Sequence, residues 1–164
     1  MRTRRLAASL LSVAMLSVGL VTLDTTTAAA ATPKCTRAIQ MKPRAAYSYY
    51  MLIPKSANTV KCYMNQGTQN RAVVALQQAL AYCYSVPTGV YGHTFGPNDI
   101  DGIYGPATRN ALEYVQIQIF PQETSAHDGI YGPRTAAAME FPWHNPSTDR
   151  IMSTCTRRDG SSAS

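Results

Sequence analysis

The stretch Asp101-Gly-Ile-Tyr-Gly-Pro-Ala-Thr-Arg-Asn-Ala-Leu112 returns 27 residues later as Asp128-Gly-Ile-Tyr-Gly-Pro-Arg-Thr-Ala-Ala-Ala-Met139. Asp-Gly is typical of a tight turn in which the glycine takes a positive φ and the aspartate accepts backbone hydrogen bonds. Gly-Pro then predicts the start of a helix, because proline at the first helical position lacks only an N–H that would be unpaired there. Two copies are too few for a solenoid, so we expect a pseudo-repeated unit inside one small bundle.

A helix is expected before the first copy, from about residue 70 to residue 84. Asn70 can cap its start, and Pro87 with Gly89 would end it. Its apolar face repeats at spacings of three and four, on Val73, Leu76, Leu80 and Tyr84. The glycine-rich stretch from Thr88 to Asp99 reads as a surface loop.

After the first copy, the apolar positions Leu112, Val115 and Ile119 continue a helix until Pro121. After the second copy, Ala138 and Met139 continue one only briefly, before Pro142. Upstream, two short runs rich in aromatic and β-branched residues, 46–53 and 59–64, flank residues 54–58 and predict a small hairpin. Such a ribbon is marginal alone, so it is expected to extend the following domain.

Residues 1–31 have the pattern of a secretory signal peptide. A basic start (Met1 to Arg5) precedes a mostly apolar run (Leu6 to Leu23) and small residues that end at Ala31. Cleavage there would leave roughly 133 residues, the size of one ordinary domain. An uncleaved membrane anchor is the alternative interpretation, because the apolar run approaches the length that spans a bilayer.

The formal charge of +6 falls to +4 when the leader's three arginines and one aspartate are removed. The remaining Lys and Arg residues are scattered, which argues against a nucleic-acid partner. A mild positive charge instead suits weak attraction to an anionic polymer such as a bacterial wall. No stable membrane insertion is expected once the leader is removed.

Four cysteines, Cys35, Cys62, Cys83 and Cys155, follow the expected cleavage site. An even number in an exported chain predicts two disulfides, and three pairings are possible. A zinc site is the competing interpretation, but the chain has no C-x-x-C and its cysteine spacings differ from those of zinc fingers. We therefore predict disulfides and no metal or cofactor.

The helical run Val73–Leu80, followed by the two Asp-Gly-Ile-Tyr-Gly-Pro units with Ala111-Leu112 and Val115-Gln116 between them, resembles the peptidoglycan-binding-like domain family. The resemblance covers about residues 66–141. Members are small three-helix modules that accompany bacterial wall hydrolases or occur alone in exported proteins. The resemblance implies a mainly α fold, namely a small three-helix bundle with a hairpin-like N-terminal extension and two disulfides.

The domain organisation that follows is a signal peptide (1–31), an N-terminal extension (32–65), the peptidoglycan-binding-like domain (66–142) and a C-terminal segment with a tail (143–164). The resemblance also implies a Cys62–Cys83 disulfide, which leaves Cys35 to pair with Cys155. Two loops depart from the usual family pattern, the long segment before Asp101 and the connection from Ile117 to His127, and they leave the choice of ligand open.

Catalysis is not expected. The three histidines, His93, His127 and His144, stand alone, without H-x-H or H-E-x-x-H, and G-x-S-x-G is absent. An even cysteine count leaves no spare thiol for a nucleophile. Paired carboxylates for glycan cleavage are harder to exclude, because their sequence spacing is unconstrained.

Ligand contacts are expected from aromatic faces, which hold sugars, and from guanidinium groups, which hold carboxylates. The candidate binding residues are Tyr104, Arg109, Tyr114, Gln116, Tyr131 and Arg134. The alternative for Tyr104 and Tyr131 is that both rings fill the core.

We predict a secreted, wall-associated, non-catalytic protein that binds peptidoglycan. An exported interaction or inhibitor protein that uses the Thr88 to Asn98 loop is the alternative hypothesis. A wall hydrolase is the third.

Overall fold

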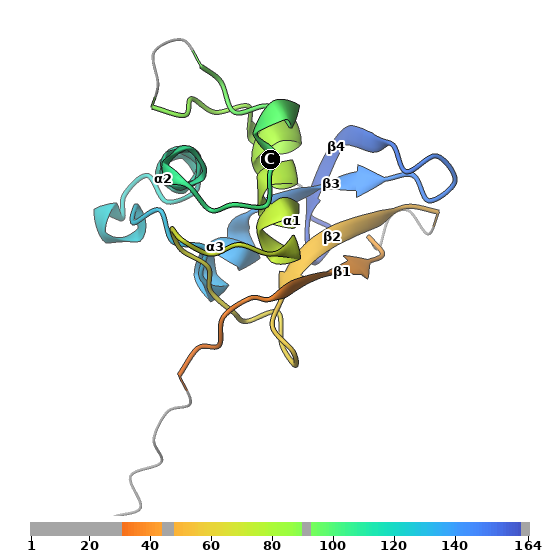
Figure 1. Ribbon diagram of the computed structural model, residues 1–164, viewed down its shortest axis with the longest axis horizontal. Coiled ribbons are helices and arrows are strands. Elements are labelled where there is room, and N and C mark those ends of the chain that lie inside the picture. Colours follow the sequence, from red (N-terminus) through yellow and green to blue (C-terminus); the bar gives the residue numbers. More distant parts are fainter. Residues whose placement is uncertain (1–30, 44–47, 90–92, 162–164) are drawn as a thin grey trace, which may run out of the picture. The chain divides into compact units, whose positions relative to one another are not determined.

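A four-stranded antiparallel sheet and three α-helices form the part of the chain that the computed structural model describes, residues 31–43, 48–89 and 93–161 (Figure 1). The strands are β1 (Arg37–Met41), β2 (Tyr50–Lys55), β3 (Glu140–His144) and β4 (Ile151–Arg157). The helices are α1 (Arg71–Ala79), α2 (Pro106–Ile119) and α3 (Pro133–Ala138). Shorter helical turns are η1 (Leu80–Tyr84), η2 (Pro97–Asp99) and η3 (Thr124–Ala126).

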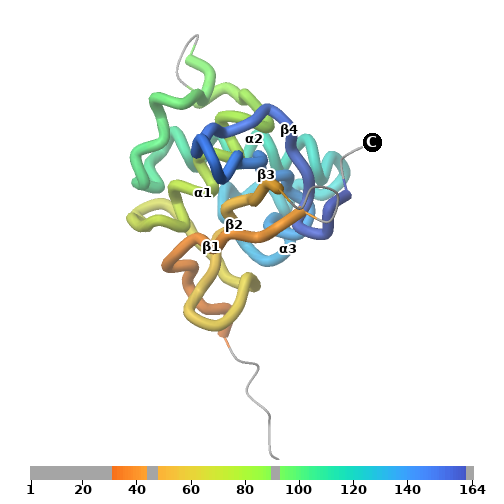
Figure 2. The backbone as a smooth tube through the Cα atoms, turned by 90° about the vertical axis from the view of Figure 1, so that its right-hand side faces the viewer, coloured from red at the N-terminus to blue at the C-terminus, as the bar shows by residue number. Residues whose placement is uncertain are grey.

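The strands lie in the order β1-β2-β3-β4, so two hairpins far apart in the sequence join through β2 and β3. Ile39 pairs with Ile53 in the first hairpin, and Tyr50 pairs with His144 where the hairpins meet. The register of β3 with β4 shifts between Pro142 and His144, which marks a bulge. The sheet faces the viewer in Figure 2.

Helix α1 lies between the sheet and α2 (Figure 1). It begins as expected at Asn70, whose side chain accepts hydrogen bonds from the backbone N–H groups of Ala72 and Val73. Buried side chains of α1 and η1 form a single core with the sheet, α2 and the two repeated turns, and it includes Leu76, Leu80, Met51, Ile53, Phe141, Leu112, Tyr104 and Tyr131.

The last turn of the first helical segment is a π-helix, η1, which ends at Ser85 in the left-handed conformation. Cys83 in η1 is disulfide-bonded to Cys155 of β4. The Tyr84 hydroxyl accepts a hydrogen bond from the Glu140 backbone N–H at 2.7 Å, and burial raises the pKa of Tyr84 to about 12. The π-turn thus joins the helical half of the molecule to the outer hairpin of the sheet.

The expected three-helix bundle is wrong: the fold contains a four-stranded antiparallel sheet, with 25% strand against 32% helix, and α3 spans only six residues. The helix following the second copy stops at Ala138 because Met139 is extended and the chain enters β3. Within the expected C-terminal segment 143–164, residues 151–157 form an edge strand of the sheet.

The expected N-terminal hairpin is also wrong in its pairing. Residues 37–41 pair with 50–55, whereas 59–64 make only isolated bridges, from Tyr63 to Lys34 and from Met64 to Tyr131. A disulfide between Cys35 and Cys62 holds this segment against the start of the described chain.

Both predicted disulfide pairings, Cys62–Cys83 and Cys35–Cys155, are therefore wrong, although the prediction of two disulfides is confirmed. The backbone N–H of Cys35 donates to the Tyr63 carbonyl at 2.9 Å, which brings Cys62 beside Cys35. Both cysteines precede the first helix in the sequence. Cys83 lies at the far end of the helical segment, next to β4. Both disulfides are compatible with an extracellular protein.

The predicted signal peptide lies outside the described residues, apart from Ala31. None of the helices in the described part of the chain has the length and apolarity required to cross a membrane.

Candidate functional site

The first repeated turn is held by Gln77, which projects from α1. The side-chain N–H groups of Gln77 donate to Asp101 Oδ1 at 2.8 Å, to the Ile103 carbonyl at 3.1 Å and to Thr108 Oγ1 at 3.1 Å. Its side-chain oxygen accepts from the Gly102 backbone N–H at 2.8 Å. One buried amide therefore satisfies four polar groups of the turn.

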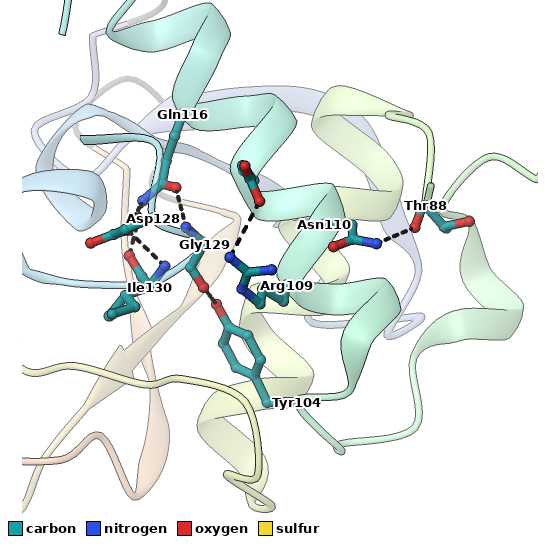
Figure 3. Close-up of polar contacts among 9 residues, drawn as sticks. Thr88, Tyr104, Arg109, Asn110, Gln116, Asp128, Gly129 and Ile130 are labelled. Atoms are coloured by element: carbon teal, nitrogen blue, oxygen red, sulfur yellow. Dashed lines mark hydrogen bonds and ion pairs between the residues drawn. The ribbon is translucent and has the colours of Figure 1, made fainter. Parts of the chain in front are cut away.

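The second turn repeats this arrangement with Gln116 of α2 (Figure 3). Gln116 donates to Asp128 Oδ1 at 2.9 Å, to the Ile130 carbonyl at 3.0 Å and to Thr135 Oγ1 at 3.3 Å. It accepts from the Gly129 backbone N–H at 2.8 Å. The two turns are thus built by equivalent groups.

The positive φ expected for the turn glycines is confirmed, at +78° for Gly102 and +63° for Gly129. The glutamine precedes its aspartate by 24 residues in the first unit and by 12 in the second. The extra residues of the first unit form the segment between η1 and Asp101. Gln77 was not predicted as a site residue, although Leu76-Gln77 and Val115-Gln116 share an apolar residue followed by glutamine.

The tyrosines of the two turns are buried. The Tyr104 hydroxyl donates to the Gly129 carbonyl at 2.8 Å and so ties the first turn to the second (Figure 3). Tyr131 occupies the equivalent place in the second turn, but its buried hydroxyl has no partner among the described residues. Burial raises the pKa of both phenols.

Three of the six candidate binding residues therefore lie in the interior, where the structure places Tyr104, Gln116 and Tyr131. Gln116 is only 1% exposed, and its amide is fully used by the second turn. The two tyrosines do not reach the surface, whereas Gln116 forms part of the wall of a hollow beside the second turn. The other three candidates, Arg109, Tyr114 and Arg134, are exposed.

The outer face of α2 carries a hollow of about 310 Å³. Its lining comes from one face of the helix and one residue of the preceding loop, namely Asn110, Glu113, Tyr114, Ile117 and Gly89. Tyr114 is 43% exposed and Ile117 is 44% exposed, which is unusual for large side chains of their apolar character. An aromatic ring, an aliphatic side chain and two polar groups thus share one open surface.

The loop edge of this hollow is fixed by a close approach of backbone to helix. The Asn110 side chain donates to the Thr88 carbonyl at 3.1 Å (Figure 3). At Gly89, φ is +82°, and an added Cβ would lie 2.7 Å from Asn110 Nδ2. Glycine is therefore required here by both conformation and space.

Arg109 lies between this hollow and the second turn. A guanidinium nitrogen of Arg109 is 3.6 Å from Glu113 Oε2 (Figure 3). Its side-chain stem packs against Gly129 so closely that an added Cβ there would be 2.6 Å from Arg109 Cγ. The arginine thus presents its charge at the rim of the α2 hollow while its stem covers the turn.

Arg134 belongs to a different surface. Its guanidinium lies 4.5 Å over the Phe120 ring and forms an ion pair with Glu123. This pairing lowers the pKa of Glu123 and raises the pKa of Arg134. Arg134 lines a second hollow of about 220 Å³ beside the turn at Asp128, so the candidate residues do not converge on one groove.

The aspartates of the turns act as hydrogen-bond acceptors. Bonds from the Gln77 side chain and from the Ile103 backbone lower the pKa of Asp101. In the described part of the chain, no group of three or more His, Cys, Asp or Glu side chains is placed to hold a metal ion.

No family model, curated protein or solved structure matches this chain. The resemblance to peptidoglycan-binding-like domains therefore stays a prediction.

Proposed function

We propose that this protein binds bacterial peptidoglycan without catalysing a reaction, and that the outer face of α2 makes the contact. The observation that carries the proposal is the hollow in which the exposed Tyr114 and Ile117 lie beside Asn110 and Glu113. Binding sites commonly join apolar surface with a few polar groups that fix orientation.

The chemistry of this surface suits a glycan strand that carries short peptides. The Tyr114 ring offers a flat face for a sugar, and the Asn110 amide can bond to hydroxyl or acetamido groups. A peptide carboxylate would compete with Glu113 for the Arg109 guanidinium, which can form two parallel bonds to a carboxylate. The pair is exposed at the surface, so breaking it costs little.

The compartment fits this function. The two disulfides are compatible with an extracellular protein. The leader-like residues 1–31 and the expected charge of +4 after cleavage support delivery to an anionic wall.

Sedimentation with purified, insoluble peptidoglycan at low salt tests the proposal. We expect the protein to sediment with the wall, and Tyr114→Ala and Ile117→Ala each to weaken binding by about tenfold, the loss of ~1.4 kcal/mol. Ile103→Ala is the matched control for Ile117→Ala, because both isoleucines are 44% exposed and Ile103 lies outside the hollow. The proposal is contradicted if the protein stays in the supernatant. It is also contradicted if Ile103→Ala weakens peptidoglycan binding as much as Ile117→Ala does.

A second candidate, an exported interaction or inhibitor protein, is favoured by the construction of the loop from Thr88 to Asn98. Phe95 is buried and its N–H donates to the Val86 carbonyl at 2.8 Å, while the Gly96 N–H donates to Asp99 at 2.8 Å. The predicted Cys62–Cys83 disulfide is not formed, so these contacts hold Phe95 and Gly96 in place.

The loop cannot be deleted cleanly, because Phe95 belongs to the core. The double variant Pro97→Ala with Asn98→Ala changes only exposed side chains. A co-purifying protein that is lost with this variant, with peptidoglycan binding unchanged, would support the interaction function. Clearing of a wall suspension by the purified protein would instead indicate a hydrolase.

A further inference from the structure

A separate hollow of about 310 Å³ lies on the sheet, far from the repeated turns in the sequence. It is lined by residues of β1, the connection from β1 to β2, the start of β2 and the connection between β3 and β4, namely Gln40, Lys42, Ser48, Tyr49, Tyr50 and Pro146. Figure 1 places the sheet and α2 on opposite sides of α1, so this hollow and the α2 hollow are distinct surfaces.

Two ring stacks give this surface a rigid aromatic base. Tyr49 stacks on Trp143 with ring centroids 5.6 Å apart, and Tyr50 stacks on His144 at 5.0 Å. The Tyr50 hydroxyl donates to Asp149 Oδ1 at 2.8 Å, which fixes the orientation of that ring. Aromatic rings held in this way lose little conformational entropy on binding a ligand.

Three polar groups around these rings are unused. The Gln40 amide, the Lys42 ammonium and the Ser48 hydroxyl form no hydrogen bond or ion pair with any residue that the structure describes. Together they offer several donors and acceptors beside the flat tyrosine faces. Such a combination suits a sugar ring, which has an apolar face and a rim of hydroxyl groups.

Other ligand classes fit less well. An extended peptide cannot pair with β2, the strand that carries Tyr50, because β2 is bonded to β1 and to β3, so a peptide could add only at the outer edge of β1. A strongly charged ligand would meet both the Lys42 ammonium and the Asp149 carboxylate, which is bonded to the Tyr50 hydroxyl at 2.8 Å. An uncharged polyhydroxylated ligand has no such conflict.

We propose that the Tyr49–Tyr50 hollow is a saccharide-binding site that takes an uncharged sugar residue. This site does not depend on the α2 face, because no residue lines both hollows. A polymer with repeated sugar units could occupy both surfaces, and two linked contacts bind more tightly than either alone.

The chain contains a single tryptophan, and Trp143 stacks directly on Tyr49. Its fluorescence therefore reports on the sheet hollow and not on α2. We expect a saturable change in Trp143 emission when the purified protein is titrated with a tetrasaccharide of N-acetylglucosamine. The same titration with Ile103→Ala should be unchanged, because the exposed Ile103 side chain lines neither hollow.

The exposed Gln40 allows a variant that leaves the core intact. Gln40→Ala should weaken the fluorescence-detected affinity at least threefold, whereas Gln118→Ala, an exposed glutamine on α2, should leave it unchanged. Tyr49→Ala alters the tryptophan environment directly, so its binding is measured by calorimetry, where we expect a loss of about tenfold, ~1.4 kcal/mol.

The outcomes separate this proposal from the α2 proposal. No saturable change in Trp143 emission overturns the sheet site, even if the protein still sediments with peptidoglycan. Full affinity in both Gln40→Ala and Tyr49→Ala overturns it as well. A normal fluorescence titration with no sedimentation would uphold the sheet site and contradict peptidoglycan binding.

Discussion

At the residue scale, the fold depends on two buried glutamines, each of which bonds to four polar groups of its turn. Replacing Gln77 with leucine keeps a side chain of similar size but removes the acceptor for the Gly102 N–H and the donor for Asp101 Oδ1 and Thr108 Oγ1. The Ile103 carbonyl also loses its bond from Gln77 and keeps only the longer one from the Thr108 hydroxyl, at 3.4 Å. Buried groups left unsatisfied cost about 1–3 kcal/mol each.

We therefore expect Gln77→Leu to lower the free energy of unfolding by about 3 kcal/mol, measured by urea denaturation. The control is Gln118→Leu on the exposed side of α2, which should change the free energy of unfolding by less than about 0.5 kcal/mol. Equal effects of the two variants would contradict the role given to Gln77.

The two turn tyrosines allow a sharper comparison, because both rings are buried and, among the described residues, only the Tyr104 hydroxyl has a hydrogen-bond partner. Tyr104→Phe leaves the Gly129 carbonyl without its donor and should cost about 1 kcal/mol of unfolding free energy. Tyr131→Phe removes a buried hydroxyl that has no partner among the described residues, so it should be neutral or stabilising. Urea midpoints of the two variants measure the difference, and a larger loss for Tyr131→Phe would refute this account.

Much of the turn could be predicted from sequence, because each residue type there meets a local backbone demand. Gly102 and Gly129 take the positive φ, and Pro106 and Pro133 start helices, as expected. The glutamines could not be predicted in the same way. Their partners lie 24 and 12 residues away, and only the folded chain brings them together.

At the element scale, the helices were predictable and the sheet was not. α1 and α2 follow an apolar period that one chain segment displays by itself. The pairing of β2 with β3 joins residues more than 90 positions apart, Tyr50 and His144, and depends on tertiary contacts. Strand β3 also contains Pro142 at a bulge, and proline in a short run argues against a strand when only sequence is available.

The second disulfide joins η1 to β4, whereas the first joins two segments that lie outside the helices and strands. Non-reducing peptide mapping should recover a peptide linking Cys35 to Cys62 and another linking Cys83 to Cys155. Because the second disulfide closes 72 residues, Cys83→Ala with Cys155→Ala should lower the unfolding free energy by about 4 kcal/mol.

The first disulfide closes 27 residues, so Cys35→Ala with Cys62→Ala should cost somewhat less, about 3.5 kcal/mol. The measurement is urea denaturation of the two double variants against the native protein. A Cys62–Cys83 peptide in the map would contradict the arrangement of η1 against β4.

At the scale of the whole molecule, the helical half and the sheet half each present one hollow with tyrosine and polar groups. Arg109 and Tyr114 could be proposed from sequence, because they follow a turn that is visible in the sequence. The sheet hollow could not, since Gln40, Tyr49 and Pro146 come together only through the joined hairpins. A candidate site could therefore be predicted from sequence only where the helices or strands that carry it could also be predicted.

The joined hairpins also make stability depend on pH through His144. This side chain is 2% exposed, stacks on Tyr50 and has a ring nitrogen without a partner among the described residues. Burial lowers the pKa of His144, and the nearby Asp149 carboxylate opposes that effect in part. The unfolded chain therefore binds a proton more readily than the folded chain once the pH falls below about 6.5.

It follows that stability should fall as the pH is lowered from about 7.5 to about 5, measured as Tm by calorimetry. His144→Phe keeps a ring against Tyr50 but cannot take up a proton, so its Tm should change less over the same interval. The lowered pKa of Asp101 does not affect this measurement. The stability that Asp101 contributes is fully present above 3.8, the ordinary pKa of an aspartate, and is lost only at lower pH. Two outcomes would contradict this prediction: a native Tm that stays constant over this interval, or a His144→Phe variant whose Tm changes with pH as much as the native Tm does. Either would show that the His144 ring gains no proton on unfolding in that interval, so that its protonation does not limit stability.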